Sequence, residues 1–197
     1  MKNFLLLIIV SCSFIACKKE DDDGSHSGSH SQHTQSVNLQ IDGFTTGAVA
    51  FQSSFIAGDA AAVTLGPVSN TFKVSYVKFL LGGTGSAETK PIDLKIYLDE
   101  GNTDPDSLLF SSSYMITSSE DILQEIDLRS ENIVITGGGS IRISLDTGNG
   151  LPSVAVDTDG TIDTQHNWIY SGGSWNTSAN YGVANDFIIR AVVEENI

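Results

Sequence analysis

The segment IDLKIYL (residues 92–98) decides the fold, because its apolar and polar side chains alternate without interruption. The segment IRISL (residues 141–145) alternates in the same way. A period of two describes a β-strand with one buried face and one face toward solvent. Within residues 71–81 the alternation changes phase at Val77, which predicts a β-bulge. Residues 187–193 are apolar at almost every position, which predicts a central strand.

Weaker strand patterns recur from Val37 onward, and turn signals such as Gly82-Gly83, residues 137–139 and Gly172-Gly173 separate them. No segment carries a helical apolar stripe of about ten residues or more. Many short strands with frequent turns are typical of a β-sandwich. Long strands and long loops favour a jelly roll over a compact immunoglobulin domain. We therefore predict an all-β fold, a jelly-roll-like antiparallel β-sandwich over residues 37–197.

The charge balance excludes one class of partner. The 197 residues include 10 Lys and Arg against 24 Asp and Glu, which gives a net charge of −14. A nucleic acid needs a basic face, and so few cations cannot assemble one. The two cysteines, Cys12 and Cys17, both precede the predicted sandwich, so the folded part can hold neither a disulfide nor a cysteine-based zinc site.

The first residues read as a targeting segment. Lys2 precedes the apolar run FLLLIIV (residues 4–10), which is too short to span a bilayer permanently and has the proportions of a secretory signal. Residues 14–17 (FIAC) then resemble a bacterial lipobox, with Phe14 in place of the usual leucine. The resemblance implies a lipoprotein signal peptide over residues 1–16 and attachment of palmitate-type acyl chains to Cys17. Such chains would hold the protein to a membrane without a spanning helix. A plain signal peptide cut elsewhere is the alternative.

The stretch KKEDDDG (residues 18–24) resembles the acidic segment behind the lipidated cysteine of surface-exposed lipoproteins in Bacteroidota-type bacteria. That resemblance implies export to the outer face of the outer membrane, whereas the alternative is a solvated charged spacer. Residues 24–36 contain no large apolar side chain, so we predict a flexible tether over residues 17–36. Its three histidines, His26, His30 and His33, either capture a metal ion or are simply part of a polar linker.

The folded part offers little for catalysis. It contains one histidine, His166, and no cysteine, and no G-x-S-x-G motif presents a serine nucleophile. We read His166 as an ordinary loop residue. Sequence spacing cannot decide whether two carboxylates face each other, but small sandwiches seldom enclose a deep cleft. We therefore predict that the protein is not an enzyme.

Two loops concentrate acidic residues, one over residues 99–106 and one over residues 157–163. Alternating carboxylates with a glycine are the hard oxygen ligands that Ca²⁺ prefers, although neither loop matches the EF-hand pattern. The second loop predicts calcium ligands at Asp157, Asp159 and Asp163. The alternative is that Asp, Gly, Asn and Pro form turns here. No cofactor is predicted to be required.

The segment NWIYSGGSWNTSANY (residues 167–181) holds both tryptophans among amides and hydroxyls. Aromatic faces pack against the C–H faces of sugars while polar groups reach the ring hydroxyls, so this composition suits carbohydrate. Trp168 and Tyr170 are alternatively core residues, and for Trp175 and Tyr181 exposure and packing stay open. The predicted ligand-binding residues are Trp168, Tyr170, Trp175, Asn176 and Tyr181.

The features together predict a non-enzymatic surface lipoprotein whose sandwich binds an extracellular ligand, with carbohydrate as the favoured class. Two alternatives remain at this point. The sandwich could serve a structural or adhesive role by binding another surface protein, or the histidines of the tether could handle metal ions.

Overall fold

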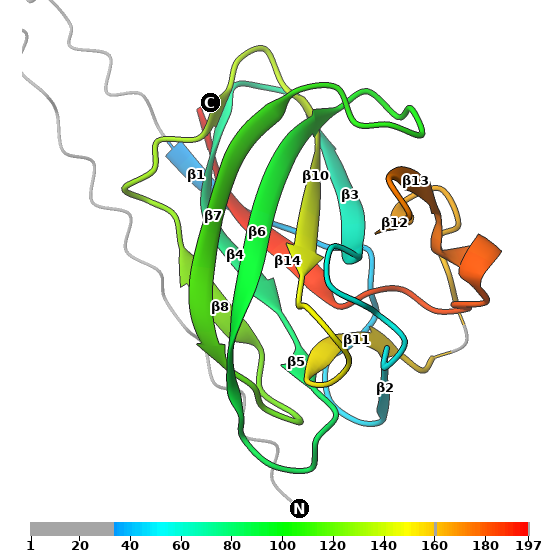
Figure 1. Cartoon of the computed structure of the whole chain (residues 1–197). Coiled ribbons are helices and arrows are strands. Elements are labelled where there is room, and N and C mark those ends of the chain that lie inside the picture. The colour runs from blue at the N-terminus through cyan, green and yellow to red at the C-terminus, as the bar shows by residue number, and fades with distance from the viewer. Residues whose placement is uncertain (1–33, 160, 197) are drawn as a thin grey trace, which may run out of the picture. The chain divides into compact units, whose positions relative to one another are not determined.

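The computed structural model describes residues 34–159 and 161–196, and Figure 1 shows them as strands joined by loops. Every pairing between these strands is antiparallel. The predicted signal peptide and most of the predicted tether lie outside the described residues. The first strand begins at Thr34, so Thr34 to Ser36 belong to the sheet although the sequence placed them in the tether.

The first sheet has β14 (Ile189–Asn196) between β1 (Thr34–Leu39) and β4 (Phe72–Phe79), and β4 continues to β8 (Gln124–Asp127). The short β9 (Val134–Ile135) also pairs with β4. The predicted central strand is thus confirmed as β14. The predicted bulge is also confirmed, because Val192 pairs with Tyr76 while Val193 pairs with Val74, which leaves Ser75 unpaired in register.

The second sheet has six strands in the order β13-β12-β3-β10-β6-β7. The two alternating segments of the sequence form its neighbouring strands β6 and β10. Figure 1 shows β7, β6, β10 and β3 side by side in front of the first sheet. The bounds are β13 (Ser174–Thr177), β12 (Asn167–Ser171), β3 (Ala60–Val68), β10 (Gly139–Asp146), β6 (Thr89–Asp99) and β7 (Leu108–Thr117).

A third, small sheet places β11 (Ser153–Asp157) between β2 (Val49–Phe51) and β5 (Leu81–Gly82). One 3-10 turn, η1 (Ser178–Tyr181), follows β13. Within the described residues no helix is long and apolar enough to cross a membrane.

The hydrophobic core lies between the two large sheets. The six-stranded sheet contributes residues such as Val63, Ile96 and Ile143, and the five-stranded sheet contributes residues such as Val77 and Ala191. All of these are fully buried, and burial of each large aliphatic side chain stabilises the fold by roughly 1.5–3 kcal/mol. The prediction of an antiparallel β-sandwich is therefore confirmed, whereas its jelly-roll part is not confirmed.

Candidate functional site

The outer face of the six-stranded sheet carries a cluster of aromatic side chains. Trp168 and Tyr170 stand on β12 opposite Ala62 and Ala60 of β3, and Trp175 stands on β13 opposite Tyr170. Because the alanines are small, the indoles and phenols can lean over β3 toward Tyr97 on β6. The Trp175 ring centre lies 6.1 Å from that of Tyr97 in an edge-on arrangement, and 5.2 Å from that of Tyr170.

Arg142 lies under this cluster and is completely buried. Its guanidinium carbon is 4.0 Å from the centre of the Trp168 ring and 5.3 Å from that of Trp175. Its Nε donates to Asp99 Oδ2 at 2.8 Å, and Asp99 is also buried. Burial lowers the pKa of Arg142, and the hydrogen bond to Asp99 opposes that effect.

The same arginine fixes the acidic loop that follows β6. Its Nη1 and Nη2 donate to the carbonyl oxygens of Thr103 and Asn102, both at 2.7 Å. Asp99 accepts a hydrogen bond from Gly101 N at 2.9 Å, and Asp106 Oδ2 accepts one from Glu100 N at 2.7 Å. The carboxylates of Asp99 and Asp106 thus accept hydrogen bonds from backbone amides of the loop and stabilise its turn, as the turn-forming alternative predicts for residues 99–106.

A small groove opens beside the aromatic cluster, with a volume of about 150 Å³. Trp175 and the half-buried Tyr97 and Tyr170 supply its aromatic side. Its polar side comes from β6 and β10, which carry charged and hydroxyl groups on the same face. We call this the aromatic groove, and its lining residues are Gly58, Ala60, Asp93, Lys95, Tyr97, Ser144, Asp146, Tyr170 and Trp175.

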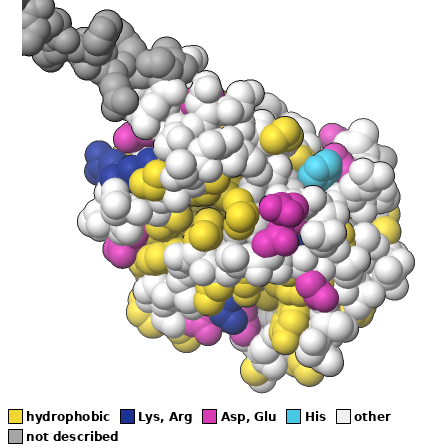
Figure 2. All heavy atoms as spheres, turned by 90° about the horizontal axis from the view of Figure 1, so that it is seen from above, with side chains coloured by type: hydrophobic (Ala, Val, Ile, Leu, Met, Phe, Trp, Pro, Cys, Tyr) yellow, Lys and Arg dark blue, Asp and Glu magenta, His cyan; other side chains and the backbone are white. Residues whose placement is uncertain are grey.

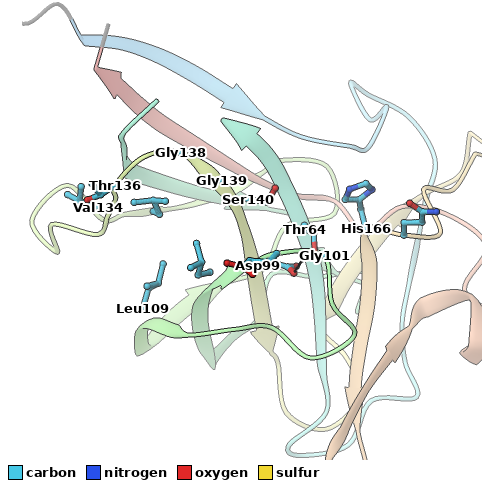
Figure 3. Close-up of a pocket in the computed structure, with 14 residues that line it drawn as sticks. Thr64, Asp99, Gly101, Leu109, Val134, Thr136, Gly138, Gly139, Ser140 and His166 are labelled. Atoms are coloured by element: carbon cyan, nitrogen blue, oxygen red, sulfur yellow. Dashed lines mark hydrogen bonds between the residues drawn. The ribbon is translucent and has the colours of Figure 1, made fainter. Parts of the chain in front are cut away.

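A second and larger pocket, of about 600 Å³, lies at one end of the sandwich, and we call it the end pocket. Figure 3 shows Leu109 and Val134 on one side of it and Thr64 and His166 on the other. Figure 2, which views the molecule from above, shows hydrophobic side chains beside acidic ones and a histidine. His166 lies in the turn before β12 and lines the end pocket, and its Nδ1 atom is 2.7 Å from an Asp163 carboxylate oxygen.

The aromatic groove and the end pocket are joined through the polar residues between them. Thr64 and Asp99 both line the end pocket, and Thr64 Oγ1 donates to Asp99 Oδ2. Thr64 Oγ1 also accepts a hydrogen bond from Trp168 Nε1 at 3.0 Å. Arg142 links Asp99 to the rings of the groove, so a single buried network connects the two openings.

The structure answers the question left open for the predicted aromatic residues. Trp168 and Trp175 are 6% and 8% exposed, so they pack rather than project from a loop. Tyr170 packs against Trp175 and also lines the aromatic groove. Tyr181 is 48% exposed, but it lines a different pocket, and Asn176 pairs with Ile169 within the sheet.

The three predicted calcium ligands do not converge. Asp163 faces His166 and the Gln165 backbone, whereas Asp157 Oδ2 accepts a hydrogen bond from Gly43 N at 2.9 Å. Asp159 Oδ1 accepts hydrogen bonds from the amide and hydroxyl of Thr161. Within residues 34–159 and 161–196, no three His, Cys, Asp or Glu side chains are close enough to hold a metal ion. The set Asp157, Asp159 and Asp163 is therefore not one site.

Sequence reasoning missed two contributors on the sheet face. The alternating pattern of residues 92–98 and 141–145 marks Tyr97 and Arg142 only as side chains on the face turned away from the core. Their parity places them on one face with Lys95, Ser144 and Thr64, and that shared parity was the available signal. The predicted lipidation site Cys17 and the predicted metal ligands His26, His30 and His33 lie outside the described residues.

Comparison with known proteins shows a likeness in fold. One solved chain, of the cysteine protease and lectin-like domains of Cwp84, a surface layer associated protein of Clostridium difficile, is 13% identical with a TM-score of 0.49, over 71% of this chain and 32% of that one. Another, the clostridial cysteine protease Cwp84 after propeptide cleavage, is 14% identical with a TM-score of 0.50, over 83% and 40%. The chain thus spans less than half of each. No family model and no curated protein matches it.

Proposed function

We propose that the sandwich binds a carbohydrate in the aromatic groove. The observation that carries the proposal is the combination of half-buried tyrosine rings with charged and hydroxyl groups on one sheet face. Tyr97 and Tyr170 flank Trp175, and Asp93, Lys95, Ser144 and Asp146 line the same space. The proposal does not rest on the likeness to Cwp84, which shows the fold alone.

The chemistry of a sugar suits this arrangement. A pyranose presents an apolar C–H face, which an aromatic ring covers, and hydroxyls at its edge, which carboxylates and ammonium groups can reach. Tyrosine contributes a large rigid surface and a polar hydroxyl with few rotatable bonds. A groove of about 150 Å³ holds one sugar ring, so further rings of a glycan would lie along the exposed sheet face.

The proposal also covers where the protein is located and how it is anchored. We propose that residues 1–16 are removed, that Cys17 carries acyl chains, and that the acidic stretch after it leads to display on the outer membrane surface. Changing Cys17→Ser is expected to abolish incorporation of labelled palmitate and to release the protein from the membrane fraction. Unchanged palmitate incorporation in this variant would contradict the lipid anchor.

The carbohydrate proposal is tested by binding of the purified protein to an array of bacterial and host glycans. Tyr97→Leu and Tyr170→Leu keep an apolar side chain against Trp175 but remove a ring face. Each is expected to weaken binding about tenfold, which corresponds to ~1.4 kcal/mol for one lost aromatic contact.

A matched control uses Tyr76, which is half-buried on β4 of the other sheet with Arg129 over its ring. Tyr76→Leu should bind as the unchanged protein does. Thermal midpoints of all three variants report whether they fold. Equal loss in all three variants, or binding to no glycan, would contradict the proposal.

A protein partner is the second candidate function, and exposed apolar side chains at the end pocket favour it. Leu109 and Val134 line that pocket and are 38% and 44% exposed, and Leu108 on the same edge strand is also exposed. Single apolar residues on a surface are common, but several around one pocket mark an interaction site. If a protein partner binds at the end pocket, Leu109→Ser should abolish that binding and leave glycan binding unchanged.

A further inference from the structure

A third pocket, of about 200 Å³, separates the loop after β1 from the end of β11. Gly43, Phe44, Thr45, Thr46 and Ala48 line one side of it, and Asp157, Thr158 and Asp159 line the other. It shares no lining residue with the aromatic groove or the end pocket.

Asp157 presents a buried oxygen that has no partner. The residue is 2% exposed, and while its Oδ2 accepts a hydrogen bond from Gly43 N, its Oδ1 has no hydrogen-bond partner among the described residues. A buried carboxylate oxygen left unpaired is costly, and native proteins rarely tolerate one without a ligand, an ion or a proton. Asp157 also lines the pocket, so a cation bound there could supply the missing partner.

A second carboxylate, that of Asp159, lines the same pocket. An ideal Cβ placed on Gly43 would be 2.7 Å from Asp159 Oδ2 and 4.0 Å from Asp157 Oδ2, so these two oxygens are at most 6.7 Å apart. Asp42 is also near and contributes to the negative potential at Asp157, but its own carboxylate is held by Arg190. Burial and these two neighbouring aspartates raise the pKa of Asp157.

We propose that this pocket binds a calcium ion between Asp157 and Asp159. Two carboxylates alone do not complete its coordination, since Ca²⁺ takes six to eight oxygen ligands. The threonine hydroxyls and backbone carbonyls of the loops, with water, supply the rest. Carbonyls and irregular geometry suit Ca²⁺ better than Mg²⁺, which demands a near-ideal octahedron. The site differs from the one expected from the sequence, because Asp163 is excluded and the Gly43 loop is included.

The test measures the thermal midpoint of the purified full chain in chelator, in 10 mM CaCl₂ and in 10 mM MgCl₂. Extracellular calcium modules have dissociation constants of about 10⁻⁴ to 10⁻³ M, so calcium is expected to raise the midpoint by several degrees and magnesium to raise it much less. The amide resonance of Gly43, which donates to Asp157, should shift with calcium and report the place of binding.

Three variants make the test specific. Asp157→Asn should lose the calcium response, and it folds readily because it removes a buried charge while keeping the shape. Gly43→Ala should weaken calcium binding at least tenfold by pushing Asp159 aside, with Asp157 unchanged. Asp106→Asn, in a distant acidic loop, should respond as the unchanged protein does.

Three results would overturn the proposal. The first is a midpoint that calcium does not change. The second is an Asp157→Asn variant that keeps the full calcium response, and the third is an equal loss in Asp106→Asn, which would mean that calcium only screens surface charge. None of these results depends on whether the aromatic groove binds sugar.

Discussion

The guanidinium of Arg142 lies 4.0 Å from the centre of the Trp168 ring, and both side chains are buried on the outer face of a sheet rather than in the core between the sheets. Cation–π contacts gain strength when water is excluded, as it is here. Arg142 also holds Asp99 and the loop carbonyls of Asn102 and Thr103. One side chain therefore joins the acidic loop to the aromatic segment.

Arg142→Met should destabilise the protein by about 3–5 kcal/mol, because it leaves the Asp99 carboxylate buried without its cation. The urea midpoint measures the loss, with an unchanged m-value if the fold is kept. Arg129→Met is the control, since Arg129 pairs with Asp127 in an exposed position. A midpoint for Arg142→Met near that of the control would show that the buried pair contributes little.

Thr64→Val should cost about 1–3 kcal/mol, because the indole N–H of Trp168 and the carboxylate of Asp99 each lose a buried partner. Urea unfolding again gives the magnitude. The matched substitution is Thr89→Val, whose hydroxyl faces Thr117 at an exposed position, and this variant should be nearly neutral. The idea fails if the two valine variants are equally stable.

Gly138→Ala should be much more damaging than Gly137→Ala. Both glycines have a positive φ, 84° and 81°, so alanine carries a backbone penalty of ~1–2 kcal/mol at either one. At Gly138 the added carbon would also overlap the carbonyl oxygen of Val68, whereas at Gly137 nothing lies within 4 Å. Comparing the thermal midpoints of the two variants separates the clash from the backbone strain, and equal midpoints would refute the clash.

The carboxylate of Asp127 should titrate with a pKa of about 2, because Arg129 donates hydrogen bonds to it from its side chain and its backbone. A pKa lowered by folding contributes stability above pH ~4, and that contribution disappears as the pH falls from ~4 toward 2. NMR titration of the Asp127 carboxyl carbon measures it. In Arg129→Gln the midpoint should rise toward 4, and an unchanged midpoint would exclude Arg129 as the cause.

The strands were predictable because their cause is local. Alternation over residues 92–98 and 141–145 and the phase change at Val77 reflect which side chains one strand must bury. The strand β13 is not among the strands that the alternation predicts, because it is short and polar. The turn signal Gly172-Gly173 is confirmed, because positive φ values of 61° and 89° at these glycines form the tight turn of a hairpin between β12 and β13.

The sites were less predictable because they depend on which strands become neighbours. Asp157 faces Gly43, 114 residues earlier in the chain, and no spacing rule relates the two positions. Arg142 becomes buried only because Trp168, Trp175 and the loop after β6 meet above it. Residues 167–181 were correctly marked as aromatic and polar, but the sequence could not show that both tryptophans would be covered.

The strand order has a mechanical consequence. The sandwich begins at Thr34, the first residue of β1, and among the described strands β1 pairs only with β14, from Thr34 opposite Asn196 to Leu39 opposite Ala191. Ladder hydrogen bonds run across the strands, so a pull along β1 loads six residue pairs together, whereas a sideways pull opens them one after another. If the protein is anchored through this strand and holds a ligand under flow, the β1–β14 pairing would therefore resist a force along β1 far better than a force that peels β1 away from β14.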